Sequence, residues 1–247
     1  MSIYLISDLH LDADQPELLA LLDAFLEHHA HDCRALYILG DLFESWVGDD
    51  DDSALAEHVA VRLTALSERG TKLYFQVGNR DFVLGPTYAA RAGMQLLPEL
   101  HLAEFHGQAV MLMHGDQLCV QDHAYQKFRT QVRDPQWQAH MLKQPLAVRQ
   151  AFAAQARAQS RAHQDGQSTA IMDVDLGAVR DLHEAHPGRL LIHGHTHRPA
   201  VHQTEHGTRV ELGDWGPLPS FLRFTAERAD LIFAGHAIAL PCFAATT

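Results

Sequence analysis

Five short motifs carry the residues of this chain that are best suited to chemistry. They are Asp8-Leu9-His10, Gly40-Asp41, Gly78-Asn79-Arg80-Asp81, His114-Gly115-Asp116 and His193-Gly194-His195-Thr196-His197. Their imidazole, carboxylate and amide groups suit Mn²⁺, Fe²⁺, Co²⁺ or Zn²⁺ better than a soft thiolate site would, and no cysteine lies in the set. A carboxylate such as Asp41 can bridge two divalent ions that together activate a water molecule. The motifs therefore predict a two-metal hydrolytic centre.

Each motif follows a short apolar run that is typical of a buried strand. These runs cover residues 3–7, 35–39, 72–77, 109–113 and 189–192. Helical patterns at residues 16–31, 53–70 and 176–185 alternate with strands, which predicts parallel pairing. Since ligands gather at the carboxyl ends of such strands, we expect the five motifs to meet. A single histidine at a strand end more often has a structural role than a metal-binding one. Here five strand ends carry Asp, Asn or His, in an order that one sheet could bring together, and coincidence is a poor explanation of that pattern.

Composition predicts one compact domain over residues 1–247 in a reducing compartment. Hydrophobic residues make up 47% of the chain, and its three cysteines are widely spaced and odd in number. The formal charge of −12 argues against a general nucleic-acid surface. No apolar run approaches the length of a spanning helix, so we expect a soluble or peripheral protein. Residues 201–233 have the pattern of antiparallel strands, whereas the tail from residue 237 has no pattern.

A helical cap is predicted as an insertion at about residues 119–170. Three helical segments there are separated near Asp134-Pro135 and Gln144-Pro145. Residues 121–163 hold seven Lys or Arg and two Asp, a local charge of +5, interleaved with apolar side chains. On the last helix a cationic stripe is expected from Arg149, Arg157, Ser160 and Arg161. The acidic run at residues 49–52 is expected to be a solvated loop that complements a helix dipole.

The motifs DLH, GDLFE, GNRD, HGD and HGHTH, in this order, resemble the signature of the calcineurin-like metallophosphoesterases. The resemblance implies an α/β sandwich of two mixed sheets flanked by helices, into which the helical cap is inserted. It also implies two metal ions. The first would be held by Asp8, His10, Asp41 and His197, and the second by Asp41, Asn79, His114 and His195. Asn79, Arg80 and His195 would be the catalytic residues.

Arg80 departs from many members of this superfamily, which have histidine at this position of the motif. That histidine can protonate a leaving oxygen, whereas a guanidinium stays charged and cannot. A guanidinium can instead hold phosphate oxygens in a bidentate manner and stabilise transition-state charge. The site therefore favours a leaving group that needs no proton, such as the phosphate of a pyrophosphate bond.

The combination of GNRD, the basic and apolar helical cap, the IMDV segment at residues 171–174 and HGHTHRP resembles a narrower group of the superfamily that acts in lipid A biosynthesis. This resemblance implies Mn²⁺-dependent hydrolysis of a UDP-linked diacylglucosamine lipid, with water attacking the α-phosphate to give UMP and 2,3-diacylglucosamine 1-phosphate. It implies a cytoplasmic enzyme associated peripherally with the inner membrane, without nucleic acid or an obligate protein partner. Substrate contacts would come from Asn79, Arg80, Asp122, Tyr125, Arg157, Ser160, Gln164, Gln167 and His195. The group usually has Asn and Lys where this chain has Gln164 and Gln167.

Two other functions remain open on the sequence alone. One is a metallophosphoesterase that acts on another nucleotide or phosphodiester substrate. The other is a non-catalytic scaffold with the same fold, although scaffolds of this kind typically lose metal ligands and this chain keeps the full set. For the cap residues, the alternative to substrate binding is a solvated helix face.

Overall fold

The computed structural model describes residues 1–165 and 173–241, without the side chains of residues 163–165. The strands are β1 (Ile3–Ile6), β2 (Ala35–Leu39), β3 (Lys72–Gln76), β4 (Met94–Leu96), β5 (His101–Phe105), β6 (Gln108–Leu112), β7 (Leu190–His193), β8 (Ala200–Thr204), β9 (Gly207–Glu211), β10 (Phe221–Phe224), β11 (Ala229–Phe233) and β12 (His236–Ala239). The helices are α1 (Pro16–His28), α2 (Ala54–Glu68), α3 (Pro86–Arg91), the short 3-10 helix η1 (Asp116–Leu118), α4 (His123–Val132), α5 (Pro135–Leu142), α6 (Leu146–Asp165) and α7 (Leu176–Ala185).

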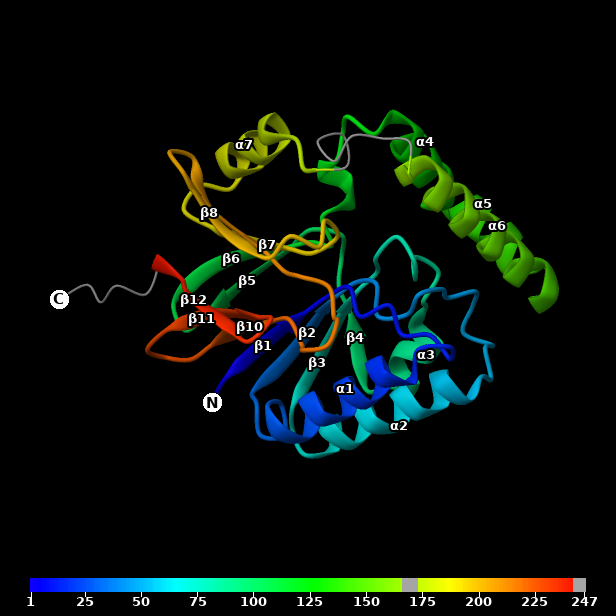
Figure 1. Cartoon of the computed structure of the whole chain (residues 1–247), viewed down its shortest axis with the longest axis horizontal. Helices are drawn as coiled ribbons and strands as arrows, with labels where there is room; N and C mark the ends of the chain where they lie inside the picture. Colours follow the sequence, from blue (N-terminus) through cyan, green and yellow to red (C-terminus); the bar gives the residue numbers. More distant parts are fainter. Residues whose placement is uncertain (166–172, 242–247) are drawn as a thin grey trace.

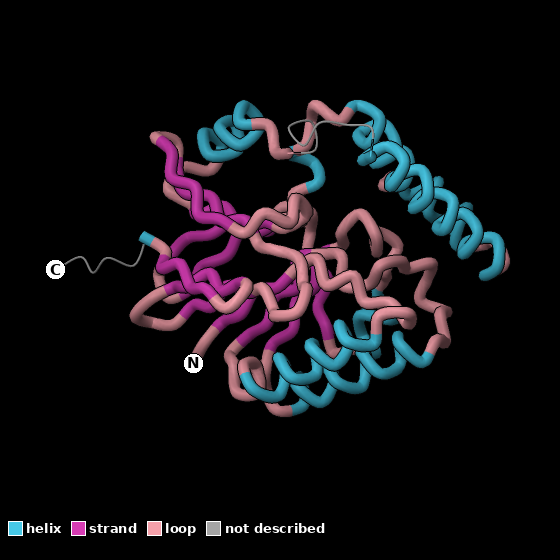
Figure 2. Tube along the Cα trace, in the orientation of Figure 1, coloured by secondary structure: helices cyan, strands magenta, loops and turns pink. Residues whose placement is uncertain are grey.

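Two mixed sheets stack against each other between two layers of helices (Figures 1 and 2). The first sheet has the order β12-β11-β10-β1-β2-β3-β4, and the second has the order β5-β6-β7-β9-β8. Strands β1 to β4 pair in parallel, as the alternation of strands and helices predicts. Helices α1, α2 and α3 lie outside the first sheet, and α7 lies outside the second (Figure 1). The predicted sandwich of two mixed sheets flanked by helices is confirmed.

The alternating side chains of β1 separate two hydrophobic cores. Ile3 and Leu5 point into the core between the two sheets, while Tyr4 and Ile6 point toward the helices of the first sheet. Because successive strand side chains face opposite sides, a strand buried on both faces must be apolar throughout. Full burial of each such side chain contributes about 1.5 to 3 kcal/mol. A third, smaller core lies between the second sheet and α7.

Side-chain caps set where several helices begin. Ser53 accepts a hydrogen bond from the Ala56 amide at the start of α2, and an aspartate does the same at the start of α4, α5 and α7. Such caps satisfy amides that have no partner within the helix. Helices α4, α5 and α6 fall within the interval predicted for the cap and lie beside one another in Figure 1.

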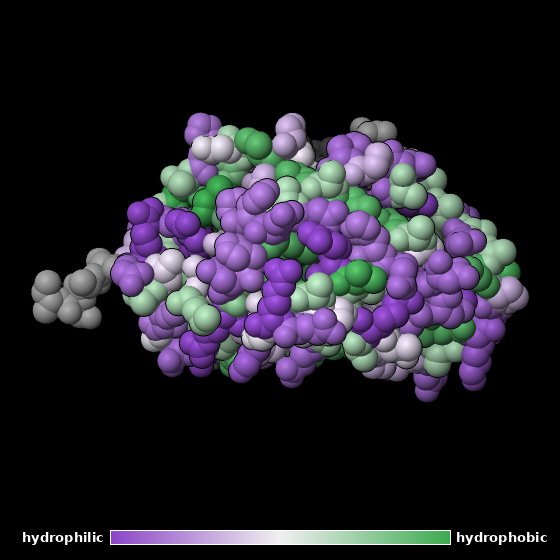
Figure 3. Space-filling model, turned by 90° about the horizontal axis from the view of Figure 1, so that it is seen from below, coloured by the Kyte–Doolittle hydropathy of each residue, from purple (hydrophilic) through white to green (hydrophobic). Residues whose placement is uncertain are grey.

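Strand β12 was not predicted from the sequence. Its residues pair antiparallel with β11, yet all four are exposed, so they lack the alternation of buried and exposed residues that identifies a strand. The face seen in Figure 3, viewed from below Figure 1, is mainly hydrophilic, with apolar side chains scattered among polar ones. Within the described part of the chain, no helix combines the length and apolar character that crossing a bilayer requires.

Candidate metal centre and substrate cleft

The predicted ligand residues meet at the carboxyl ends of five strands. Asp8 and His10 follow β1, Asp41 follows β2, Asn79 follows β3, His114 follows β6, and His195 and His197 follow β7. The potential ligand atoms of Asp8, His10 and His197 lie within 4.8 Å of one another, as do those of Asp8, Asp41 and His114. Both sheets therefore contribute side chains to one cluster.

The backbone of this cluster is unusually strained. Seven non-glycine residues among those described have positive φ, and five belong to the cluster: Asp8, His10, Asp41, His195 and His197. Left-handed backbone at a non-glycine residue costs roughly 1 to 3 kcal/mol and persists only where the surroundings enforce it. This geometry turns each side chain sharply off the end of its strand and toward a common point.

Two glycines let the loops approach closely. A Cβ at Gly78 would lie 2.1 Å from Oδ1 of Asp41, and a Cβ at Gly40 would lie 2.6 Å from Nδ1 of His114. No side chain larger than hydrogen fits at either position without displacing a cluster residue.

Asp81 holds the loops after β2 and β3 together. Its buried carboxylate accepts hydrogen bonds from the amides of Gly78 at 2.7 Å, Leu42 at 2.8 Å and Asp41 at 3.3 Å. Burial and the nearby charge of Asp41 raise the pKa of Asp81 to about 6, although the amide bonds oppose this shift. Asp81 thus fixes the backbone of two candidate ligands without facing the cluster itself.

Hydrogen bonds outside the cluster orient two imidazoles. Nδ1 of His114 donates to the Leu39 carbonyl at 2.8 Å, so Nε2 faces the cluster, where it lies 2.8 Å from Oδ1 of Asn79. Nδ1 of His10 lies 2.9 Å from the Glu44 carboxylate, and its Nε2 lies 3.3 Å from Nε2 of His197. Outer contacts of this kind select the tautomer whose free nitrogen can bind a metal.

The electrostatics of the cluster fit a divalent cation. Oδ1 of Asp8 is buried without a hydrogen-bond partner among the described residues. Although burial opposes the shift, His197 and the other cluster histidines lower the pKa of Asp8. Burial and the charge of His114 lower the pKa of His195 to about 4, which keeps this imidazole neutral. The buried Oδ1 of Asp8 lies 3.4 Å from Nε2 of His197, and a carboxylate oxygen among imidazole nitrogens is a donor set that suits a transition-metal ion.

A cleft of about 660 Å³ opens over the cluster. Its polar lining includes His10, Asp41, Asn79, Arg80, His195 and His197. Its apolar lining comes from the cap and from the neighbouring loops: Trp46, Val47, Phe82, Val83, Phe128, Trp137, Met141 and Phe152. Its volume is typical of sites for small molecules, and its mixed lining suits a ligand with both a charged and an apolar part.

The family model for calcineurin-like phosphoesterases matches residues 1–199. The chain belongs to this family. Family membership means that the chain is an enzyme, and it implies the use of divalent metal ions.

Relatives from several bacteria align along nearly the whole chain. A protein of Xanthomonas oryzae pv. oryzae (strain PXO99A) is 47% identical and covers 94% of this chain and 98% of its own length. One of Stenotrophomonas maltophilia (strain K279a) is 47% identical, covering 92% of this chain and 96% of its own. One of Escherichia coli O7:K1 (strain IAI39 / ExPEC) is 45% identical and covers 94% of this chain and 98% of its own length. All three are named UDP-2,3-diacylglucosamine hydrolase.

Arg80 lies in the cleft of this phosphoesterase with an unused donor. Its Nε is buried and has no hydrogen-bond partner among the described residues, and its Nη1 lies 3.7 Å from Glu44. Its backbone amide donates to Oδ1 of Asp41 at 2.8 Å, which ties it to the cluster. A buried, unsatisfied guanidinium donor beside the cluster is suited to an oxyanion.

Of the predicted substrate residues in the cap, Asp122, Tyr125, Arg157 and Ser160 line the cleft. The hydroxyl of Tyr125 donates to Asp116 at 2.6 Å, and its ring stacks on His195 with the ring centroids 5.8 Å apart. Tyr125 therefore presents its ring, not its hydroxyl, to the cleft. The Gln164 side chain and all of Gln167 lie outside the described residues.

The predicted cationic stripe on α6 requires correction. Arg149 is only 3% exposed and donates to the Val47 carbonyl at 2.6 Å and to the Asp50 carboxylate, so it ties the cap to the core. Arg129 has a similar role in α4, because its Nε donates to Asp116 at 2.9 Å. Part of the positive charge of the cap therefore holds the cap in place.

The acidic run at residues 49–52 is a half-exposed to exposed loop, as predicted, but two of its aspartates also have specific partners. Asp49 accepts amide hydrogen bonds from Gly85, Thr87 and Tyr88 at the start of α3, and Asp50 pairs with Arg149. The expected helix-dipole role thus belongs to Asp49 and α3, and Asp50 is a cap anchor.

Sequence reasoning did not assign roles to three acidic residues: Glu44, Asp81 and Asp116. Each stands two or three positions after a candidate ligand, within the motifs GDLFE, GNRD and HGD. That spacing was the available signal. Their role could not be read from it, because each has partners outside its own motif.

Proposed function

We propose that this phosphoesterase hydrolyses the pyrophosphate bond of UDP-2,3-diacylglucosamine, giving UMP and 2,3-diacylglucosamine 1-phosphate. The observation that carries this proposal is the cleft, which is lined both by the ligand cluster with Arg80 and by apolar residues of the cap. The first group suits a diphosphate, and the second suits acyl chains. The names of the relatives support the same substrate.

We propose that two Mn²⁺ ions bind the cluster, one held by Asp8, His10, Asp41 and His197 and the other by Asp41, Asn79, His114 and His195. Divalent ions bound there supply a Lewis acid and an activated water for attack on the α-phosphate.

Arg80 supports the choice of a pyrophosphate over a simple ester. Its guanidinium can donate to phosphate oxygens and stabilise charge as the bond to the α-phosphorus breaks, but it cannot protonate a leaving alkoxide. The departing sugar phosphate needs no such proton. Asn79 and His195 lie beside Arg80 in the cleft and complete the set that we propose to contact the phosphates.

We also propose peripheral binding to the inner membrane through the cap. Leu142 and Val148, on successive cap helices, are 41% and 48% exposed, and apolar side chains beside a positively charged segment favour anionic bilayers. Co-sedimentation with anionic vesicles should fall for Leu142→Asp and stay unchanged for Leu218→Asp, an exposed leucine outside the cap. Equal co-sedimentation of both variants would argue against this mode of binding.

The substrate proposal is tested by supplying Mn²⁺ with UDP-diacylglucosamine, a cyclic nucleotide, a dinucleoside polyphosphate or an aryl phosphate. We expect turnover of the lipid in ¹⁸O water, with the label in UMP. Arg80→Ala should lower kcat/KM by about 100-fold or more, while the exposed control Arg69→Ala keeps wild-type activity. Turnover of the simple esters without turnover of the lipid would favour a different phosphoesterase substrate.

A further inference from the structure

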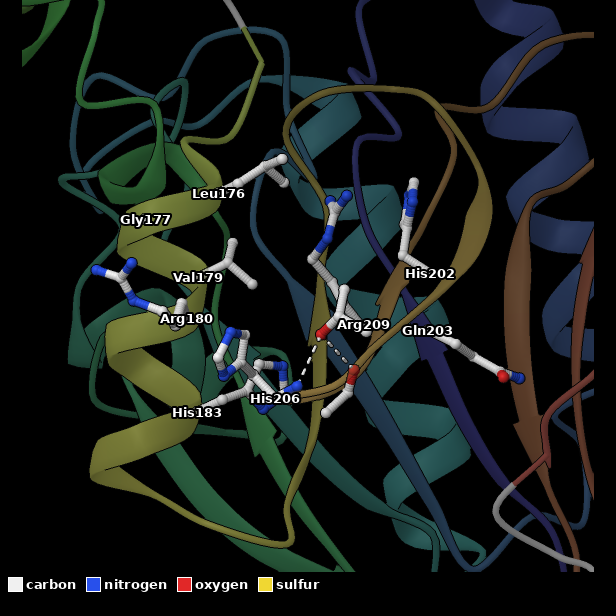
Figure 4. A pocket seen from close by; sticks show the side chains of 11 residues that line it. Leu176, Gly177, Val179, Arg180, His183, His202, Gln203, His206 and Arg209 are labelled. Carbon is white, nitrogen blue, oxygen red and sulfur yellow. Dashed lines mark hydrogen bonds between the residues drawn. The ribbon is translucent and has the colours of Figure 1, made fainter.

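A second cavity of about 600 Å³ lies between α7 and the β8–β9 hairpin. We call it the α7 cavity. Side chains from the helix and from both strands surround it (Figure 4), and among the described residues none lines both this cavity and the substrate cleft. It lies on the outer side of the second sheet, so it is a separate site from the metal cluster.

The central feature of the α7 cavity is His183. This residue is 2% exposed, yet neither ring nitrogen has a hydrogen-bond partner among the described residues. Buried polar atoms are nearly always paired, so two orphaned nitrogens on one ring call for an explanation. The ring also packs against β9, because a Cβ at Gly207 would lie 2.5 Å from its Nδ1. His183 is therefore confined where it lines the cavity.

The surroundings of His183 are rich in hydrogen-bond donors. Burial, together with the positive charges of His206 and Arg209, lowers the pKa of His183. Arg209 is 5% exposed, and its Nη1 donates to Glu211 at 2.9 Å and to Nε2 of His193 at 3.0 Å. Among the side chains that the structure describes, its hydrogen bonds are made by Nη1, not by Nε or Nη2. Spare donors and positive charge beside an unpaired imidazole favour an anionic ligand.

The acidic groups nearby already have partners. Glu211 bonds with Arg209 and Thr196 and lies 3.3 Å from His202. On α7, Asp181 pairs with Arg180, which also lines the cavity. The carboxylates around the α7 cavity therefore do not satisfy His183.

The α7 cavity also offers apolar contact. Leu176 lies at its edge and is 70% exposed, and Val179 follows one turn later on the same face of α7. The volume falls in the range of small-molecule sites and exceeds what an inorganic phosphate alone would fill. An occupant with both an acidic group and an apolar body uses all of these features.

We propose that the α7 cavity binds a small organic phosphate, whose phosphoryl oxygens bond to His183 beside Arg209 and His206 and whose apolar part contacts Leu176 and Val179. A phosphate group suits this site because it accepts hydrogen bonds on several oxygens, and the donors come from both the helix and the hairpin.

The test uses phenylphosphonate, a tetrahedral anion on an aromatic ring whose C–P bond resists hydrolysis. It is titrated into the full chain loaded with Mg²⁺, and backbone amides are followed by NMR. We expect saturable shifts at residues 176–183 and 202–209, besides any at the cleft. Benzyl alcohol, which has the ring without the charge, should bind the α7 cavity at least about tenfold more weakly.

Two variants distinguish the α7 cavity from the cleft. His183→Phe should weaken phenylphosphonate binding at the cavity at least about tenfold, whereas His186→Phe, the same change outside the cavity on the same helix, should not. Leu176→Glu keeps an exposed position and adds repulsion, so it should weaken binding several-fold even if His183→Phe folds poorly; Leu218→Glu is its control.

Shifts confined to the cleft, unchanged binding in His183→Phe and Leu176→Glu, or equal binding of benzyl alcohol would each overturn the proposal. None of these outcomes depends on hydrolysis of the lipid, so this proposal and the proposed function can fail separately.

Discussion

The carboxylate of Glu44 lies 2.9 Å from Nδ1 of His10 and so decides which nitrogen of this imidazole faces the cluster. The other oxygen of the same carboxylate lies 3.7 Å from Arg80. One side chain thus positions both a candidate metal ligand and the candidate phosphate-binding guanidinium. The positive charges of His10 and Arg80, together with the His10 hydrogen bond, lower the pKa of Glu44 despite burial, so it stays ionised at neutral pH.

We expect Glu44→Ala to weaken Mn²⁺ binding by about 10- to 100-fold, because His10 loses the bond that fixes its tautomer. Glu44→Gln keeps an acceptor oxygen for His10 and should bind metal better than the alanine variant, while its kcat/KM still falls because Arg80 loses its ionic partner. Equilibrium dialysis with metal analysis measures the affinity. Glu17→Ala, an exposed glutamate of α1, is the control, and equal metal affinity in all four proteins would contradict the assignment.

Asp81→Asn should destabilise the fold by about 1 to 3 kcal/mol. An asparagine keeps one acceptor oxygen but directs an NH₂ group at backbone amides that now donate to the carboxylate. Urea unfolding at neutral pH measures this loss. The exposed Asp14→Asn should unfold like the wild type, and a similarly small effect at Asp81 would mean that its three amide contacts are dispensable.

Asp50→Ala should loosen the cap, because it leaves the guanidinium of Arg149 buried without its carboxylate. The expected loss of stability is about 1 to 3 kcal/mol, less than for a fully buried pair since the Asp50 side chain is 63% exposed. Hydrogen exchange should rise in α6. The exposed Asp52→Ala is the matched control.

The double variant Asp50→Ala/Arg149→Leu tests the origin of this loss of stability. It distinguishes the loss of the ion pair from the cost of leaving the Arg149 guanidinium buried without a carboxylate. It should be more stable than Asp50→Ala alone, because it removes the stranded cation. A double variant that is no more stable would show that Arg149 contributes mainly through its bond to the Val47 carbonyl.

His183 should make stability depend on pH. Its pKa is lower in the folded state than in the unfolded chain, so the unfolded chain takes up a proton first as the pH falls through the ordinary histidine range. The contribution of neutral His183 to the free energy of unfolding is therefore complete above that pH range. Below it this contribution declines by at most about 1.4 kcal/mol per pH unit.

His183→Phe removes this dependence. Its stability relative to the wild type should improve as the pH is lowered from 7.5 to 5.5 in urea unfolding experiments, while His186→Phe should follow the wild type. A constant difference between His183→Phe and the wild type across this range would contradict the lowered pKa of His183.

The sequence by itself predicted the parallel strands and the polar residues at their ends, while the two-sheet sandwich and the ligand set were implied by the resemblance of its motifs to a family. Apolar runs such as residues 35–39, each followed within two positions by Asp, Asn or His, encode both a buried strand and a polar group at its end. Both signals are local, because strand periodicity and the position of a residue after a strand depend only on neighbouring residues. The exposed strand β12 carries neither signal, which is why it was missed.

Only the tertiary structure decided which polar groups act on the cluster and which hold the molecule together. Arg149 and Arg157 both line the cleft, yet the first is buried and bonded to Asp50, whereas the side chain of the second is 28% exposed. Glu44 and Asp81 find their partners about 35 to 40 residues away in the chain. Such pairings arise from the packing of loops at the ends of two different sheets, and no local pattern records them.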